Sequence, residues 1–228
     1  MFRAQLPRLF ELLDLQADLA FPDGYFQEDF EIELQDDPLR LPVYACWEKR
    51  FHFLDEDAWN ALKNEAAQYL TCRHKRRGWH QLFDILGQAD AYKHLRDIGC
   101  SEIRFIPRSS REGLKTPDLE GLLDSRRVLC EVKTINISDA EVRARSEHTA
   151  HNVKCELDFR FFRKLQSDIT GAKDQMHVYD ATGEARHLVY ISICFDDDHH
   201  KSAYFRQIDQ YLMDNPIPEI EVVFSASR

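Results

Sequence analysis

Residues 116–136 read TPDLEGLLDSRRVLCEVKTIN, and their pattern is the strongest indication of the fold in this sequence. Its apolar residues form two runs, Leu119–Leu123 and Val128–Ile135. The short polar connection Asp124–Arg127 lies between them. Two short apolar runs separated by a polar connection predict two antiparallel strands joined by a turn.

Charged residues occupy matching positions in the two strands of this hairpin. Because side chains alternate between the faces of a strand, Asp118 and Glu120 share one face, and Glu131 and Lys133 share one face of the neighbour. Two carboxylates and an ammonium are therefore expected to converge in an otherwise apolar sheet. Mg²⁺ is usually held by one or two carboxylates, and it lowers the pKa of an attacking water in phosphodiester cleavage. A lysine beside such acids can hold a phosphate oxygen or orient the water.

The motifs Pro117-Asp118 and Glu131-x-Lys133 resemble the two half-motifs of the PD-(D/E)xK, or restriction-endonuclease-like, nuclease superfamily. The resemblance implies catalytic roles for Asp118, Glu131 and Lys133. It also implies metal binding by Asp118, Glu131 and the backbone carbonyl of Val132. The cofactor would be Mg²⁺ or Mn²⁺, and the activity would be phosphodiester hydrolysis in nucleic acid, with DNA expected rather than RNA. The alternative is an exposed hairpin with an incidental Glu-Lys pair, since E-x-K alone is common.

The order of the expected elements agrees with this resemblance. From residue 79 onward we expect a helix, three strands, helices, a strand, a helix and a strand. This order matches the α-β-β-β-α-β core of the superfamily, an α/β fold with a mixed central sheet flanked by helices, over about residues 79–195. The expected helices cover 57–70, 79–98, a segment opening at Ser138, 158–175 and 200–213, and the expected strands cover 101–107, 187–195 and 220–224.

The N-terminal quarter differs from the rest in charge. Residues 1–60 contain 5 Lys+Arg and 14 Asp+Glu, whereas residues 71–133 contain 13 and 9. We therefore expect an acidic N-terminal extension, residues 1–56, followed by a nuclease-like domain, residues 57–228. Within the extension, alternating apolar residues predict a strand at 30–34, and 41–53 is a second strand candidate. The acidic segment could dock a protein partner or form a homodimer.

Four further side chains are candidates for the site. Gln88 stands where many superfamily members have an acid. An amide is a poor substitute for a charged metal ligand, but it can hydrogen-bond a metal-bound water. Glu120 is either a third carboxylate of the site or a charge at the edge of the strand. Lys164 and Gln175 resemble site-facing residues of the second core helix in several branches of the superfamily, or they belong to an ordinary solvated helix face.

Other polar clusters have simpler interpretations. Acidic residues in 196–198 and the following histidines favour helix capping over a metal site. His148 and His151 lie at helical spacing without a third ligand. A basic run at 73–77 could form a phosphate-tracking rim with residues that flank the hairpin, namely Arg108, Arg111, Lys115, Arg126 and Arg127.

Bulk composition places the chain among soluble proteins. The six cysteines are scattered singly, which favours reduced thiols in a cytoplasmic protein and argues against a zinc site. No apolar run approaches the roughly 20 residues that cross a bilayer, so no membrane partner is expected. The net charge of -10 and the amide at Gln88 leave open a second reading. In that reading the chain is a catalytically inactive nuclease-like module that serves nucleic-acid binding or complex assembly.

Overall fold

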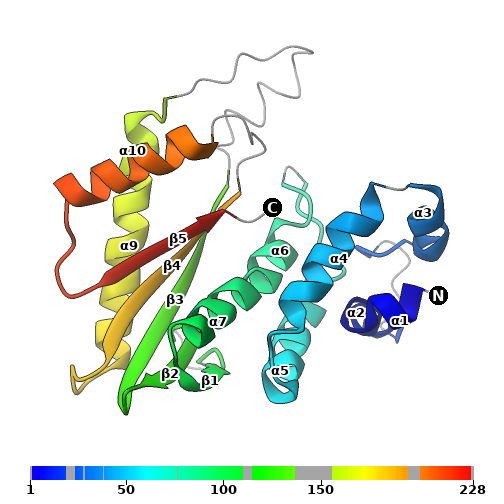
Figure 1. Cartoon of the computed structure of the whole chain (residues 1–228), viewed down its shortest axis with the longest axis horizontal. Helices are drawn as coiled ribbons and strands as arrows, with labels where there is room; N and C mark the ends of the chain where they lie inside the picture. The colour runs from blue at the N-terminus through cyan, green and yellow to red at the C-terminus, as the bar shows by residue number, and fades with distance from the viewer. Residues whose placement is uncertain are drawn as a thin grey trace. The chain divides into compact units, whose positions relative to one another are not determined.

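The computed structural model describes residues 2–18, 24–27, 29–37, 39–75, 77–109, 115–136, 156–194 and 201–226. The chain divides into two compact units, Met1–Phe105 and Ile106–Arg228 (Figure 1). The assignment of residues 57–228 to one domain stays a prediction. The helix expected from Ser138, the histidines at 148 and 151, and the acidic run at 196–198 lie outside the described residues.

The first unit is built from helices that end in one strand. Its centre holds Leu9, Leu12 and Trp59, which are all fully buried. The helix expected at 57–70 is confirmed as α5, whose N-cap Asp55 accepts the N–H of Ala58 at 2.8 Å. The elements are α1 (Phe2–Gln5), α2 (Pro7–Asp18), α3 (Phe30–Asp36), α4 (Arg40–Phe51), α5 (Glu56–Ala67), α6 (His80–Leu86), α7 (Gln88–Asp97) and β1 (Ser101–Phe105).

The two strands expected in the acidic segment are wrong, because α3 and α4 are helices. In α3, Phe30 and Leu34 are buried one helical turn apart, while Ile32 between them is 58% exposed. The alternating pattern is therefore equally compatible with one apolar helix face. In α4, Pro42 lies in the first helical turn, where its missing N–H costs no intrahelical hydrogen bond.

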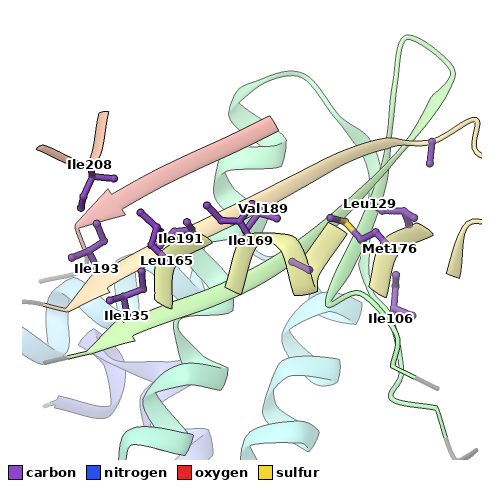
Figure 2. Packing of buried hydrophobic residues seen from close by; sticks show 12 residues of the cluster. Ile106, Leu129, Ile135, Leu165, Ile169, Met176, Val189, Ile191, Ile193 and Ile208 are labelled. Atoms are coloured by element: carbon purple, nitrogen blue, oxygen red, sulfur yellow. The ribbon is translucent and has the colours of Figure 1, made fainter. Parts of the chain in front are cut away.

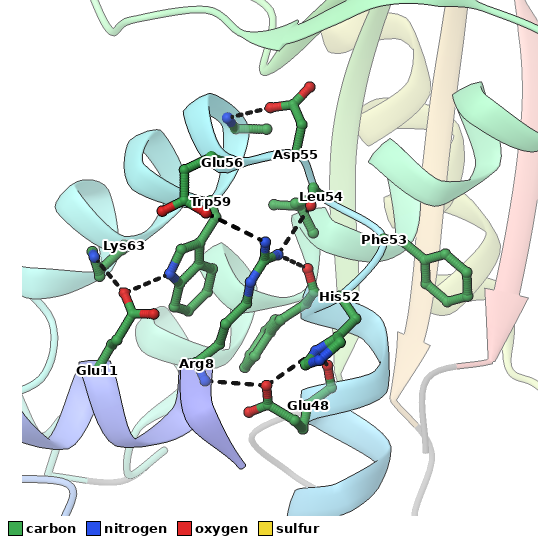
Figure 3. A network of polar contacts seen from close by, with 12 residues as sticks. Arg8, Glu11, Glu48, His52, Phe53, Leu54, Asp55, Glu56, Trp59 and Lys63 are labelled. Atoms are coloured by element: carbon green, nitrogen blue, oxygen red, sulfur yellow. Dashed lines mark hydrogen bonds and ion pairs between the residues drawn. The ribbon is translucent and has the colours of Figure 1, made fainter. Parts of the chain in front are cut away.

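A buried carboxylate joins α2 to α4 (Figure 3). Glu48, only 4% exposed, accepts the backbone N–H groups of Arg8 at 3.1 Å and of Leu9 at 2.9 Å. These donors belong to the first turn of α2, which begins at Pro7 without a capping serine, threonine or aspartate. Glu48 thus satisfies helix N–H groups from a distant part of the chain, and its charge suits the helix dipole.

The single helix expected at 79–98 is divided into α6 and α7 at Gly87. Glycine is suited to this junction because an added Cβ would lie 3.0 Å from the carbonyl oxygen of Phe83. The strand expected next is confirmed as β1.

The described strands form one five-stranded sheet in the order β1-β2-β3-β4-β5. The pair β2–β3 is antiparallel, and the pairs β3–β4 and β4–β5 are parallel. The fold is therefore mixed α/β, with an open mixed sheet flanked by helices, as expected at this level. The elements of the second unit are β2 (Leu119–Leu123), β3 (Arg126–Asn136), α9 (Phe159–Tyr179), β4 (Arg186–Cys194), α10 (Lys201–Asp214) and β5 (Glu221–Ala226).

Helix α9 covers the sheet of the second unit through an apolar stripe (Figure 2). The stripe consists of Leu165, Ile169, Ala172 and Met176, at spacings of three and four residues, and all four are buried. It packs against apolar side chains of β3 and β4, namely Leu129, Ile135, Val189, Ile191 and Ile193. Burial of this stripe sets the rotation of α9 about its axis and hence which polar residues it turns toward the hairpin. No helix in the described part of the chain is both long and apolar enough to span a bilayer.

Candidate active site

A tight turn sets the register of the hairpin that carries the charged residues. Asp124 and Ser125 have φ values of 51° and 64°, so both central residues of the turn are left-handed, as a type I′ hairpin turn requires. Arg126 already belongs to β3, so the connection is shorter than expected. Leu119 is paired with Cys130, which places the residue before β2 next to Glu131.

Asp118 is held by its backbone and by its side chain. Its N–H donates to the carbonyl of Cys130 at 3.1 Å, and its carbonyl accepts the N–H of Ile106 at 2.9 Å. Its Oδ2 accepts the N–H of Val132 at 2.7 Å. The carboxylate is therefore fixed over β3, beside the predicted ligand Glu131. The bond uses the N–H of Val132, and metal binding by its carbonyl stays a prediction.

Glu131 is the buried centre of the polar cluster. It lies on β3 between β2 and β4 and is 5% exposed. Its Oε1 accepts Lys133 Nζ at 2.6 Å, and its Oε2 accepts Gln175 Nε2 at 2.7 Å. The same amide nitrogen of Gln175 donates to the carbonyl of Thr116 at 2.7 Å. The structure thus brings Gln175 together with Glu131 and Lys133, as the sequence suggested, and adds the carbonyl of Thr116.

Burial and neighbouring charges act in opposite directions on Glu131. Burial raises the pKa of its carboxyl above the ordinary value of 4.5, and the positive charges of Lys133 and Lys115 oppose that rise. Lys115 is exposed, directly before Thr116. The sequence assigned Lys115 only to the basic rim, and its charge effect on Glu131 became visible only with the fold. An added cation at this position would favour the ionised carboxylate for the same electrostatic reason.

Glu120 is buried but bonds a different cation. Its Oε2 accepts Nε and Nη2 of Arg127 at 2.8 and 2.5 Å, and the guanidinium lies 5.2 Å from the ring centre of Tyr179. This arrangement ties the turn end of the hairpin to the last turn of α9. A direct role for Glu120 at the site stays a prediction.

The structure separates Lys164 from Gln175. Both lie on α9, but eleven residues at 1.5 Å rise place them about 16 Å apart along the helix. Lys164 is 64% exposed and forms an ion pair with Asp168 at 2.5 Å. Gln88, the first residue of α7, is buried in the first unit, and its place at the site stays a prediction.

The donor set suits a hard divalent cation better than zinc. Asp118 and Glu131 supply carboxylate oxygens, and Mg²⁺ needs only one or two of these because waters and substrate complete its shell. Each carboxylate has acceptor capacity beyond the bonds described above. Within the described ranges, no three His, Cys, Asp or Glu side chains gather as an all-protein metal site would require. The oxygen donors present therefore fit Mg²⁺ or Mn²⁺.

Comparisons of the chain with protein-family models, with curated proteins and with solved structures found no match.

Proposed function

We propose that the chain is a metal-dependent nuclease of the PD-(D/E)xK type that hydrolyses phosphodiester bonds, with DNA as the expected substrate. The observation that carries this proposal is the convergence of Asp118, the residue before β2, with Glu131 and Lys133 on β3. Support also comes from the element order α7, β1, β2, β3, α9, β4, which is compatible with the α-β-β-β-α-β core of that superfamily. The restriction-endonuclease-like identity of this core is part of the proposal.

The proposed reaction assigns each polar group a task. Asp118 and Glu131 would hold Mg²⁺ or Mn²⁺, which supplies charge neutralisation at the phosphate and a lower pKa for the attacking water. Water adds to phosphorus, the bond to the leaving oxygen breaks, and that oxygen takes up a proton. Lys133, held at 2.6 Å by Glu131, donates to a phosphate oxygen or orients the water. Gln175 keeps the Glu131 carboxylate in one orientation during this step.

The test is cleavage of labelled single- and double-stranded DNA and RNA in Mg²⁺, Mn²⁺ or EDTA. Wild type should cut in the presence of metal, and Lys133→Ala should not. Lys173→Ala is the matched control, because Lys173 also lies in the second unit and also pairs with a carboxylate, Glu219, at 3.0 Å. Cleavage by Lys133→Ala at the wild-type rate would show that the proposed mechanism is wrong.

The alternative, an inactive module for nucleic-acid binding or assembly, is favoured by one observation. Both oxygens of Glu131 already have side-chain donors, Lys133 and Gln175, so the cluster can serve as a structural link between β3 and α9. Calorimetric titration with Mn²⁺ separates the two readings. A nuclease binds the ion and loses it in Asp118→Asn, whereas an inactive module shows no binding that this substitution removes.

A further inference from the structure

Two backbone hydrogen bonds close a small loop in the first unit by pairing His74 with Gly78. The N–H of His74 donates to the carbonyl of Gly78 at 2.8 Å, and the N–H of Gly78 donates back at 3.0 Å. Nδ1 of His74 accepts the N–H of Arg77 at 3.1 Å. Gly78 has a φ of +57°, a left-handed conformation that glycine adopts without strain. These bonds fix the backbone at His74, Arg77 and Gly78.

The loop displays cations in a part of the chain without acids. Residues 71–83 contain four Lys+Arg and no Asp+Glu, although residues 1–60 carry an excess of nine acids. The side chains of Arg73, Lys75 and Arg77 are exposed. A shaped group of exposed cations suits a polyanion with closely spaced charges, such as a nucleic-acid backbone. The excess of acids in residues 1–60 would repel the same polyanion, so binding would be confined to the loop.

Two aromatic residues that follow the loop, Trp79 and Phe83, pack against rings from earlier in the chain. The rings of Tyr25 and Trp79 are 5.7 Å apart, those of Tyr25 and Phe83 are 5.6 Å apart, and those of Trp47 and Phe83 are 5.2 Å apart. All three contacts are edge-to-face, which holds the rings in fixed orientations. Phe83 is nevertheless 39% exposed. A rigid ring with an accessible part can stack on an unpaired base, which is how single-stranded nucleic acid is commonly held.

Two contacts bring the loop and the rings to the same end of α6. The rings of His74 and His80 are 5.2 Å apart and meet edge to face. The N–H of Phe83 donates to the carbonyl of Trp79 at 3.1 Å, so Phe83 lies one helical turn beyond the loop. Exposed cations and a partly exposed ring therefore lie close to the first turn of α6, and the surface is defined here as residues 73–75 and 77–83.

We infer that the surface formed by residues 73–75 and 77–83 binds single-stranded nucleic acid. Arg73, Lys75 and Arg77 contact phosphates, and Phe83 stacks on a base. The inference deepens the proposed function, on which it rests for the class of ligand, but it requires neither the metal nor Glu131. Binding is therefore measured without cleavage, and the two proposals can fail separately.

The experiment is fluorescence anisotropy in EDTA with a labelled oligothymidylate of about 20 nucleotides, longer than the roughly 4–16 that one single-strand-binding domain covers. Lys75→Ala should weaken binding, and Lys49→Ala, an equal charge change at another exposed lysine of the first unit, should not. The double variant Arg73→Ala/Lys75→Ala should reduce the slope of log affinity against log salt by about 0.7 for each lost contact. Equal affinities of Lys75→Ala and Lys49→Ala would overturn the inference.

Phe83→Leu tests stacking while keeping an apolar side chain. It should weaken oligothymidylate binding at least about five-fold, the low end for one stacked base. Phe53→Leu is the matched control, a half-buried ring that instead contacts Lys93. Binding of a duplex as tight as the single strand and unchanged in Phe83→Leu would overturn the single-strand assignment. Metal-dependent cleavage with no binding defect in any loop variant would overturn this inference and leave the nuclease standing. If binding needs the loop but the protein neither cleaves nor binds metal, the nuclease proposal is overturned and this inference stands.

Discussion

Gln175 on α9 and Glu131 on β3 are joined by a 2.7 Å hydrogen bond although they are 44 residues apart in the chain. The same amide bonds Thr116, two residues before Asp118. One side chain therefore links the helix, the central strand and the segment that carries the other predicted ligand. The geometry of the site depends on how α9 packs on the sheet.

Replacing Gln175 with alanine should destabilise the protein by about 1–3 kcal/mol, because a buried carboxylate oxygen and a backbone carbonyl lose a donor. It should also lower the cleavage rate, since Glu131 then keeps its bond from Lys133 but loses the one from α9. Urea unfolding, read as a change in midpoint at constant slope, measures the first effect. The control is Gln166→Ala on the same helix, where the partner is the exposed hydroxyl of Tyr211 and the expected change is within about 0.5 kcal/mol. A Gln175→Ala variant as stable as that control would contradict the role assigned to the amide.

Two substitutions of Asp118 should separate its structural bond from its charge. Asp118→Asn keeps an acceptor for the N–H of Val132 and should cost less than about 1 kcal/mol, whereas Asp118→Ala removes the acceptor and should cost about 1–3 kcal/mol. Both should abolish Mn²⁺ binding, because the hard cation loses a charged ligand. Calorimetry and thermal unfolding measure the two effects. Wild-type metal affinity in Asp118→Asn would remove Asp118 from the ligand set.

Stability should depend on pH through His187, which is 4% exposed. Burial and the charge of His177 lower its pKa below the ordinary 6.5, although Asp180 opposes this. The unfolded chain therefore takes up the proton first, so the stability supplied by neutral His187 is fully present above pH 6.5 and declines as pH falls below it. The pKa of Asp180 itself is lowered: burial raises it, but bonds from Ala185 and Thr182 outweigh burial, so this carboxylate stays ionised in that range.

The measurement is urea unfolding of wild type and His187→Gln from about pH 7.5 down to about pH 5. The stability difference between the two proteins should shrink toward acid, because glutamine has no proton to bind. The other histidines are common to both chains and largely cancel in the difference. A constant difference over the whole range would show that His187 does not titrate as expected.

Glu48→Ala should destabilise the first unit by about 1–3 kcal/mol or more, because two N–H groups of α2 lose their acceptor. Glu48→Gln should cost less, since one amide oxygen can still accept. The control is Glu56→Ala, whose side chain is 76% exposed and whose loss should change stability by no more than about 0.5 kcal/mol. Thermal unfolding of the three variants decides the matter, and equal effects of Glu48→Ala and Glu56→Ala would contradict the capping role.

Local pattern predicted those elements whose apolar period was unambiguous. The stripe Leu165, Ile169, Ala172 and Met176 fits only a helix, and α9 carries it. The expectation failed for α3, where Phe30 and Leu34 satisfy both a period of two and a spacing of four. In the structure the segment is a helix, and the rings of Phe10 and Tyr44 pack on Phe30 with ring centres 6.1 and 5.1 Å away. A five-residue segment contains too little information to choose its own period.

Part of the candidate site likewise follows from local pattern, and part depends on how the elements pack. The hairpin and the positions of Asp118, Glu131 and Lys133 could be predicted from the sequence alone, because strand alternation and a short turn act over a few residues. The ion pair Lys164–Asp168 is local, because its members lie one helical turn apart on α9. Packing between elements was needed to join Gln175 to Glu131, and to join Glu48 to the first turn of α2, 39 residues away. Such bonds depend on the burial of apolar faces, which sets the rotation and height of each helix and is a property of the packed chain.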